Sequence, residues 1–453
     1  MAEHPNNILV LRNMYLIDMS ANGESIKKNK IVIIENHRIK AVHDAVEFKH
    51  QKQTSQTEVD LGGQYLIPGL IDLHVHSTNP FIEPSDALRL SNLISVFNQV
   101  KENLLSCIRS GVTTIRDLGS PPGIMRFMKM IESGRIIGPR IKPSFSMISC
   151  PGGYPDMVPP FNLAARLLMN GQFAEKAFDA DHADKIVHTL VDKGAAWIKT
   201  VYQNESYMFG NPKLAVLSDD SFVAIARAAR DRKRKIALHA LSVEGFRKGI
   251  DLQVDTIEHL PLQELEKEDI NKLAKSRITI VPTLIAPGGY LEKMISLLKD
   301  IITSSAYYLV GKSRQHTLGI IEQIRAGILT KNMIDYNYLR RTFNFMINNL
   351  RRLHEAGACI GLGTDAGGAD ICIFGLPWLE MQLMSEAGMQ NYEILEIATR
   401  KNAAVLGLEQ DLGSIEPGKL ADMVLLEANP LEDLRNVSKV SHVWKEGKLL
   451  YKK

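Results

Sequence analysis

The sequence predicts an α/β protein: a (β/α)8 TIM barrel with a small β-sandwich domain formed from both termini. Three observations lead to this fold class. Eight short apolar runs alternate with amphipathic helical stretches through the middle of the chain, whereas both ends contain short β-like segments between turn residues. The length of 453 residues also suits one large barrel plus a modest second domain. We expect the sandwich over residues 1–67 and 407–453 and the barrel over residues 68–406.

The terminal segments share a β-like texture. Turns rich in Asn, Gly and Lys separate the first three, and Glu446, Gly447 and Lys448 form the turn of a C-terminal hairpin. Pro417 lies in a turn-rich run that cannot be helix interior. Strands are expected over residues 8–14, 31–42, 58–66, 421–426 and 440–451.

The alternation of apolar runs and amphipathic stretches in the middle of the chain is typical of parallel strands joined by crossover helices. Ser218 is a good N-cap for a helix over residues 222–232, and the long segment 286–352 predicts extra helices near the rim of the barrel. No G-x-G-x-x-G fingerprint follows the first strand, so a closed barrel is favoured over a doubly wound dinucleotide-binding sheet. Its strands are expected over residues 70–75, 113–116, 141–147, 197–201, 235–238, 255–258, 278–281 and 359–363.

Composition excludes several other classes of protein. Lys and Arg total 54 against 51 acidic residues, and a net charge of +3 argues against a nucleic-acid binder. The four cysteines show no C-x-x-C spacing, which indicates reduced thiols. Because the N-terminus lacks a basic region followed by an apolar core, and no apolar run approaches bilayer length, we expect neither a secretory signal nor a membrane partner. A cytoplasmic protein is the expectation.

Two histidines stand at the end of the first predicted barrel strand. His74 and His76 are two residues apart, and alternation along a strand points both side chains to the same face. At the C-terminal end of a barrel strand that face is the axis, where two imidazoles can chelate one metal. Taken alone, the pair is weak evidence for a metal, because two buried, hydrogen-bonded histidines would show the same spacing.

Metal-competent groups recur at four further strand ends. Lys199 ends an apolar run, and burial of an unpaired ammonium is costly unless its pKa falls; a neutral amine can react with CO₂ to form a metal-bridging carbamate. His239, His259 and Asp365 end the fifth, sixth and eighth strands. Each residue alone could be a buried core residue with its hydrogen bonds made, and Lys199 could belong to a structural ion pair. Six such groups at the face where barrels place their sites predict a metal centre.

The order H-x-H, Lys, His, His, Asp resembles the amidohydrolase superfamily. The segments LIPGLIDLHVH, GVTTIRDLG and GSIEPGKLADMVLL extend this resemblance over nearly the whole chain. The segments GPRI, TIEH, VPTL and NPLEDL are most similar to the branch that contains imidazolonepropionase-related amidohydrolases and metal-dependent Xaa-Pro dipeptidases (prolidases).

The resemblance implies a binuclear centre of two divalent metal ions, with zinc as the first expectation. His74, His76 and Asp365 would bind the more buried metal, His239 and His259 the outer one, and an N-carboxylated Lys199 would bridge them. A metal-bridging hydroxide would attack the substrate, while Asp365 acts as general base and then acid. The implied reaction is cleavage of an amide or peptide C–N bond in a dipeptide or an N-acyl amino acid.

Other functions remain open at this stage. A mononuclear deaminase or an imidazolone- or lactam-ring hydrolase would not need a carboxylated Lys199, and a lactonase would use the same hydroxide on an ester. A non-catalytic scaffold that kept the fold is the alternative from another class. The expected partner is a small-molecule substrate, and a homo-oligomer is left open.

Substrate contacts are expected to depart from those of the relatives. Tyr154 stands where a histidine is common, and Leu241 stands two residues beyond His239, where His or Tyr is often found. Tyr154, Tyr202 and Tyr207 are candidates for lining a substrate pocket, although aromatic residues in loops often only cover a core. Alternation predicts that Glu258 points away from the His259 side.

Overall fold

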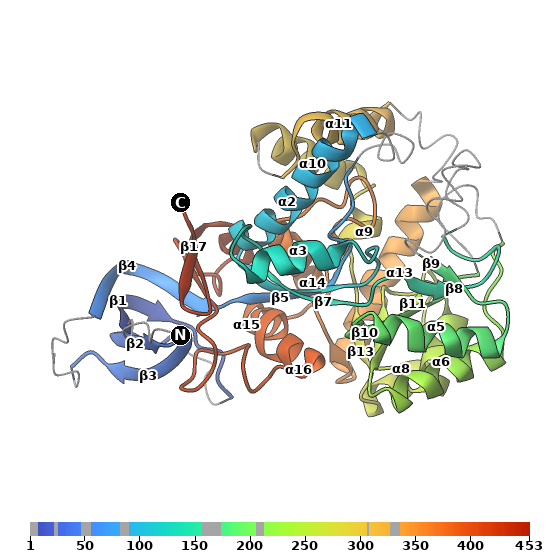
Figure 1. Cartoon of the computed structure of the whole chain (residues 1–453), viewed down its shortest axis with the longest axis horizontal. Coiled ribbons are helices and arrows are strands. Elements are labelled where there is room, and N and C mark those ends of the chain that lie inside the picture. Colours follow the sequence, from blue (N-terminus) through green and yellow to red (C-terminus); the bar gives the residue numbers. More distant parts are fainter. Residues whose placement is uncertain are drawn as a thin grey trace.

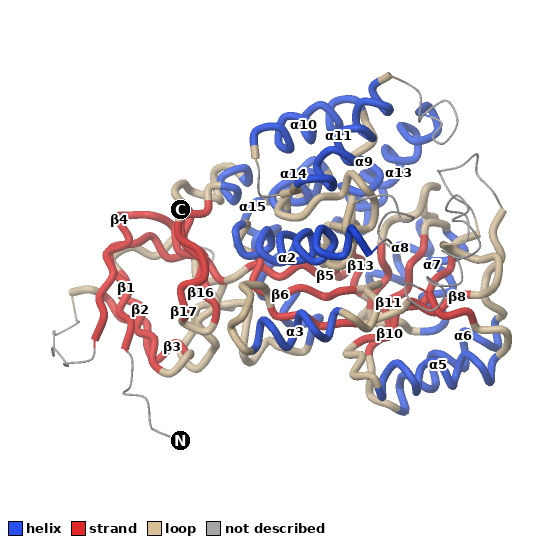
Figure 2. The backbone as a smooth tube through the Cα atoms, turned by 45° about the horizontal axis from the view of Figure 1, so that its top comes forward, coloured by secondary structure: helices blue, strands red, loops and turns tan. Residues whose placement is uncertain are grey.

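The computed structural model describes residues 8–21, 26–46, 56–81, 90–155, 174–204, 213–305, 308–326 and 336–453. A sheet made from both termini lies at one end of the molecule, and a barrel of parallel strands with outer helices forms the rest (Figures 1 and 2). The predicted α/β architecture is confirmed. No helix in the described ranges combines the length and the apolar character needed to cross a membrane, and the four cysteines are unpaired.

The terminal strands form one continuous seven-stranded sheet in the order β17-β16-β15-β4-β1-β2-β3. Strand β1 pairs parallel with β4, and the remaining neighbours are antiparallel. Val32 near one end of the sheet and Trp444 near the other belong to the same buried cluster, so the sheet folds over a shared core. The strands are β1 (Ile8–Leu16), β2 (Lys30–Glu35), β3 (Arg38–Asp44), β4 (Gln56–Pro68), β15 (Met423–Leu426), β16 (Val440–Lys445) and β17 (Lys448–Lys452).

The parallel strands close into a ring. Two hydrogen-bonded sheets, β5-β6-β7 and β14-β13-β12-β11-β10-β8-β9, meet at both junctions: Leu73 N donates to Leu362 O at 3.0 Å, and Ala196 N donates to Pro143 O at 2.8 Å. The strands are β5 (Leu70–Val75), β6 (Val112–Asp117), β7 (Arg140–Pro143), β8 (Met147–Ser149), β9 (Ala174–Lys176), β10 (Trp197–Tyr202), β11 (Lys235–Ala240), β12 (Thr256–Glu258), β13 (Thr279–Val281) and β14 (Cys359–Ile360).

Two of the predicted barrel strands differ from the observed ones. The third is split into β7 and β8, because Phe145 between them adopts a left-handed conformation (φ 59°). The eighth ends at Ile360, where the side chain of Asn402 takes over the pairing: its Nδ2 donates to Ile71 O and its Oδ1 accepts from Leu362 N. A side chain at Gly363 would meet Val281 and His74 at 2.6 and 2.7 Å, so glycine permits this close approach.

Helices cover the outside of the barrel, and the predicted extra helices are present between β13 and β14. The predicted cap at Ser218 is also confirmed, since its side chain accepts a hydrogen bond from Ser221 N. The helices are α2 (Leu93–Arg109), α3 (Ile124–Glu132), α5 (Ala180–Asp192), α6 (Asp219–Asp231), α7 (Val243–Leu252), α8 (Lys267–Lys275), α9 (Ile285–Gly288), α10 (Glu292–Ser304), α11 (Gly311–Arg325), α13 (Tyr336–Glu355), α14 (Pro377–Glu386), α15 (Asn391–Glu396) and α16 (Asn402–Leu406), with short turns η1 (Leu90–Asn92), η2 (Ile397–Lys401) and η3 (Leu434–Ser438).

Candidate metal centre

Six side chains selected from the sequence meet at one end of the barrel. His74 and His239 lie near the C-terminal ends of their strands, and Lys199 lies in the middle of β10. His76, His259 and Asp365 follow the ends of β5, β12 and β14. Together the six line one cavity of about 80 Å³ in the described part of the chain. Five of the six are almost completely buried, and His76 is about one-sixth exposed. The set consists of His74, His76, Lys199, His239, His259 and Asp365.

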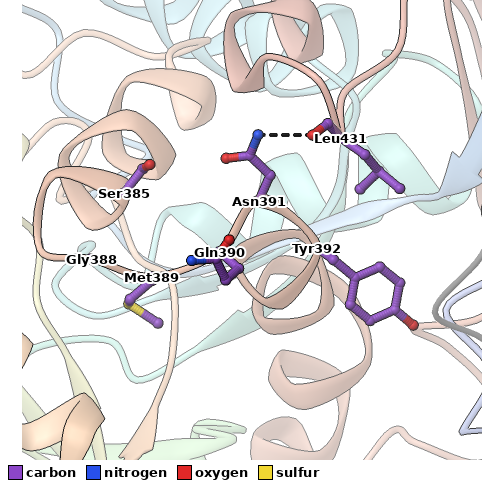
Figure 3. A pocket seen from close by; sticks show the side chains of 7 residues that line it. All are labelled: Ser385, Gly388, Met389, Gln390, Asn391, Tyr392 and Leu431. Atoms are coloured by element: carbon purple, nitrogen blue, oxygen red, sulfur yellow. Dashed lines mark hydrogen bonds between the residues drawn. The ribbon is translucent and has the colours of Figure 1, made fainter.

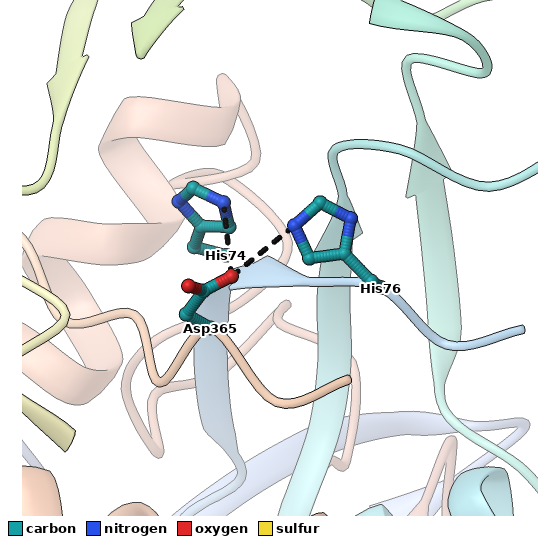
Figure 4. Close-up of side chains that lie close together, drawn as sticks. All are labelled: His74, His76 and Asp365. Atoms are coloured by element: carbon teal, nitrogen blue, oxygen red, sulfur yellow. Dashed lines mark ion pairs between the residues drawn. The ribbon is translucent and has the colours of Figure 1, made fainter. Parts of the chain in front are cut away.

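His74, His76 and Asp365 form the tightest group (Figure 4). One ligand atom from each lies within 4.8 Å of the others. Oδ1 of Asp365 is 3.1 Å from His76 Nε2 and 3.5 Å from His74 Nε2. Asp365 adopts a left-handed backbone conformation (φ 55°), a local strain of the kind that functional sites retain.

A buried ion pair holds His74 from the other side of its ring. His74 Nδ1 donates to Glu258 Oε2 at 2.8 Å, and the other Glu258 oxygen accepts from Arg116 Nη2 at 2.7 Å. Arg116 and Glu258 are both fully buried. Because a carboxylate only accepts, Nδ1 carries the hydrogen and His74 Nε2 is left with its lone pair toward Asp365.

The prediction that Glu258 points away from the His259 side is wrong. Strict alternation would turn Glu258 away if His259 faced the axis, yet both side chains face inward. The reason is that β12 ends at Glu258 and His259 adopts a left-handed conformation (φ 72°), so the two residues no longer alternate.

His239 and His259 form the second part of the cluster, with ring centroids 4.4 Å apart. Thr283 Oγ1 donates its one hydrogen to Pro282 O, so it must accept from His259 Nδ1, 2.6 Å away. His239 Nε2 is 2.7 Å from Gln203 Oε1, an acceptor. The free lone pairs are therefore Nε2 of His259 and Nδ1 of His239.

Lys199 is a buried amine without a hydrogen-bond partner among the described residues. Burial lowers the pKa of Lys199 to about 8, so part of the amine is unprotonated near neutral pH. At this depth an ammonium without a hydrogen-bond partner is unfavourable, and the charges of Glu258 and Asp365 offset only part of the cost of burial.

The donor set fits divalent metal ions. Burial holds the pKa of His74, His239 and His259 well below the usual range, so these imidazoles are neutral and keep a lone pair for a metal. His76 differs: burial lowers its pKa, but the hydrogen bond to Asp365 and the charges of Asp365 and Asp117 together raise it above the usual value. Imidazole and carboxylate oxygen together suit zinc and similar ions.

Several residues that shape the site were not selected from the sequence. Gln203 and Thr283 contact His239 and His259, and Arg116 supports His74 through Glu258. Their position just inside or beyond strand ends was the available signal. Asp72 and Asp117 lie near the histidines but accept hydrogen bonds from backbone and hydroxyl groups and not from an imidazole. Asp72 accepts from Thr364 and from His74 N, and burial raises its pKa to about 6; Asp117 accepts from Ser77 and Ser120.

The three candidate tyrosines have different positions. Tyr154 lines the cavity and stacks on His239 with ring centroids 4.8 Å apart. Burial raises the pKa of the Tyr154 hydroxyl, which keeps it a hydrogen-bond donor. Tyr202 packs on Phe222 and is not among the residues that line this cavity. Tyr207 lies outside the described residues.

A second hollow, of about 390 Å³, lies at the turn between α14 and α15 (Figure 3). Asn391 at its edge donates to Leu431 O. Its described lining contains no carboxylate, imidazole, amine or thiol. We therefore place the chemistry at the barrel mouth.

Comparison with known proteins gives a consistent result. Residues 65–450 match the sequence profile described as the Amidohydrolase family. The chain is similar to ochratoxinase from Aspergillus niger, with 24% identity over 405 residues that cover 85% of this chain and 75% of that protein. It is also similar to imidazolonepropionase from Fusobacterium nucleatum, with 22% identity over 469 residues, 95% of this chain and 94% of that one. A solved structure of a Xaa-Pro dipeptidase with bound methionine superposes with a TM-score of 0.76 at 22% identity, covering 98% of this chain and all of that one.

Proposed function

Since this chain belongs to the amidohydrolase family and is therefore a hydrolase acting on C–N bonds, we propose that it cleaves the amide bond of a dipeptide or an N-acyl amino acid at a centre of two divalent metal ions. The observation that carries this proposal is the buried Lys199 amine, which has no hydrogen-bond partner among the described residues and lines the same cavity as four histidines and Asp365.

The proposed ligands divide into two sets around that lysine. His74 and His76 with Asp365 form the inner set, His239 and His259 form the outer set, and N-carboxylated Lys199 joins them. Bound divalent cations supply two effects at such a site, because they lower the pKa of water and polarise a carbonyl. Zinc is the first ion to test, given the imidazole-rich donor set.

Asp365 carries the proton in this proposal. Its Oδ1 faces the two inner histidines, and its carboxylate lies in the same cavity as the reacting groups. It accepts a proton from the attacking water and delivers it to the leaving nitrogen. Tyr154 stacks on His239 and points a donor hydroxyl at the same cavity, where it would contact the substrate.

One observation favours a second candidate function. Only His74, His76 and Asp365 bring their ligand atoms within 4.8 Å among the described residues. Such a group of three suits a single ion, as in a deaminase or an imidazolone- or lactam-ring hydrolase. A lactonase would use the same centre on an ester.

Metal content per chain separates the two candidates. Protein prepared with divalent metal and bicarbonate is expected to hold about two ions per chain, falling to about one or fewer in Lys199→Ala. Lys142→Ala is the matched control, because Lys142 is also a barrel-strand lysine with a pKa lowered by burial but has Arg140 and Asp411 as its charged neighbours. One ion per chain in both the unaltered protein and Lys199→Ala would favour the single-ion function.

A further inference from the structure

The cavity at the barrel mouth is lined by two chemically different groups of side chains. The first group is the six metal-competent residues. The second group, the apolar lining, consists of Met147, Leu241, Ala286, Pro287, Met346 and Ala369. Met346 is completely buried and Leu241 is 8% exposed.

Half of this apolar lining comes from the helices inserted between β13 and β14. Ala286 and Pro287 belong to α9, and Met346 belongs to α13. Glu380 on α14 fixes the start of α9, since its two carboxylate oxygens accept from Leu284 N and Ile285 N at 2.8 and 2.9 Å. The part of the apolar lining that α9 contributes is therefore held to α14.

The charged side chains that line the cavity in the described part of the chain all belong to the metal-competent group. Among the lining residues in the described ranges, Asp365 is the one carboxylate, and it already faces His74 and His76. A substrate ammonium in the cavity would lose its hydration without gaining a free acidic partner, whereas an alkyl or aryl group would gain apolar contact.

We propose that the inserted helices make the enzyme selective for an uncharged, apolar acyl group, so that N-acyl amino acids bind in preference to dipeptides with a free amino group. This inference rests on the proposed amide hydrolysis at the same cavity. It assigns the inserted segment a role in substrate selection.

A pair of compounds that differ only in the ammonium group tests the inference. Valyl-leucine and 3-methylbutanoyl-leucine have the same carbon skeleton around the amide bond. The KM of each compound with the unaltered, metal-loaded full chain measures its apparent binding. We expect the N-acyl compound to bind at least tenfold more tightly. Equal binding, tighter binding of valyl-leucine, or no binding of either compound would overturn the inference.

Substitution of Met346 tests the role of the apolar lining in substrate selection. Met346→Glu places a carboxylate on this lining and is expected to shift the binding ratio at least tenfold toward valyl-leucine, while the isosteric Met346→Gln shifts it less. Phe345→Gln is the control on the same helix, since Phe345 is 39% exposed and does not line the cavity. An unchanged ratio in folded Met346→Glu counts against the inference. If that variant does not fold, the ratio in the unaltered chain alone decides.

Hydrolysis by the unaltered, metal-loaded chain separates this inference from the proposed function. If both compounds are cleaved at equal rates, the selectivity is absent but amide hydrolysis stands. If neither compound nor any other dipeptide or N-acyl amino acid is cleaved, the proposed function fails.

Discussion

The two parts of the histidine cluster are supported in different ways. His74 rests on Glu258 and Arg116, a fully buried ion pair, whereas His239 and His259 rest on the neutral side chains of Gln203 and Thr283. All four contacts are short, so the difference lies in charge and not in distance. A buried charge is costly when its partner is lost, while a neutral hydrogen bond contributes about 1 kcal/mol. We therefore expect replacement of the residues that support His74 to be more costly than replacement of those that support His239 and His259.

The largest expected effect comes from removal of Arg116. Arg116→Met leaves the Glu258 carboxylate buried without its cation, which should lower the free energy of unfolding by about 3–5 kcal/mol. Denaturant unfolding of metal-free protein measures this change. The double variant Arg116→Met, Glu258→Leu should recover most of the loss, because it removes both charges.

An exposed arginine provides the control for that measurement. Arg38 also pairs with a carboxylate, Asp411 at 2.8 Å, but its side chain is 48% exposed. Arg38→Met should cost only about 0–1 kcal/mol. A comparable loss in both single variants would contradict the importance of burial.

Glu258→Gln is expected to have the next largest effect. Glutamine keeps an acceptor for His74 Nδ1 but removes the negative charge that makes the imidazole more basic. Affinity for the first divalent ion should fall about 10- to 100-fold. Competition with a chromophoric chelator measures it, and an affinity within twofold of the unaltered chain would show that the charge of Glu258 is unimportant.

Thr283→Val should have a smaller effect on the neutral side. Valine preserves the shape of the side chain but removes the acceptor that fixes the hydrogen on His259 Nδ1, at a cost of about 1 kcal/mol. Affinity for the second ion should fall about fivefold to tenfold, with the first ion little changed. A larger loss for the first ion would contradict the division of the cluster into two parts.

The smallest effect is expected when the neutral partner of His239 is replaced by a charged one. Gln203→Glu gives His239 a charged partner like that of His74, and the affinity for the second ion should rise by about threefold to tenfold. Gln203→Leu, measured by the same competition assay, should lower it. The division by charge would be unsupported if both variants changed the affinity in the same direction.

The sequence was sufficient to predict an element where a single residue pattern or capping residue determines it. Residues 70–75 form strand β5 as predicted, and the side chains on both of its faces are buried. Ser218 caps helix α6, because its hydroxyl accepts a hydrogen bond from the first turn. The placement of the six cavity residues follows from the same logic, because parallel strands in a barrel end at a common face. The domain limits at residues 67 and 407 stay a prediction.

The remaining features depend on backbone conformations that periodicity does not encode. Positive φ at Phe145 splits a predicted strand, and positive φ at His259 turns both Glu258 and His259 toward the axis. The partner of Glu258, Arg116, is 142 positions away in the sequence, so only the closed barrel brings the two together. Such pairings depend on the tertiary structure.

The sheet built from both ends of the chain has a consequence for biosynthesis. Strand β4 ends at Pro68, and its neighbour β15 begins at Met423, 355 positions later. At translation rates of about 5–20 residues per second, the ribosome needs roughly 20–70 seconds to deliver that partner. During this interval one edge of β4 has no native neighbour, and an exposed strand edge is a site for aggregation. The newborn chain is therefore expected to depend on chaperones until its last strands emerge.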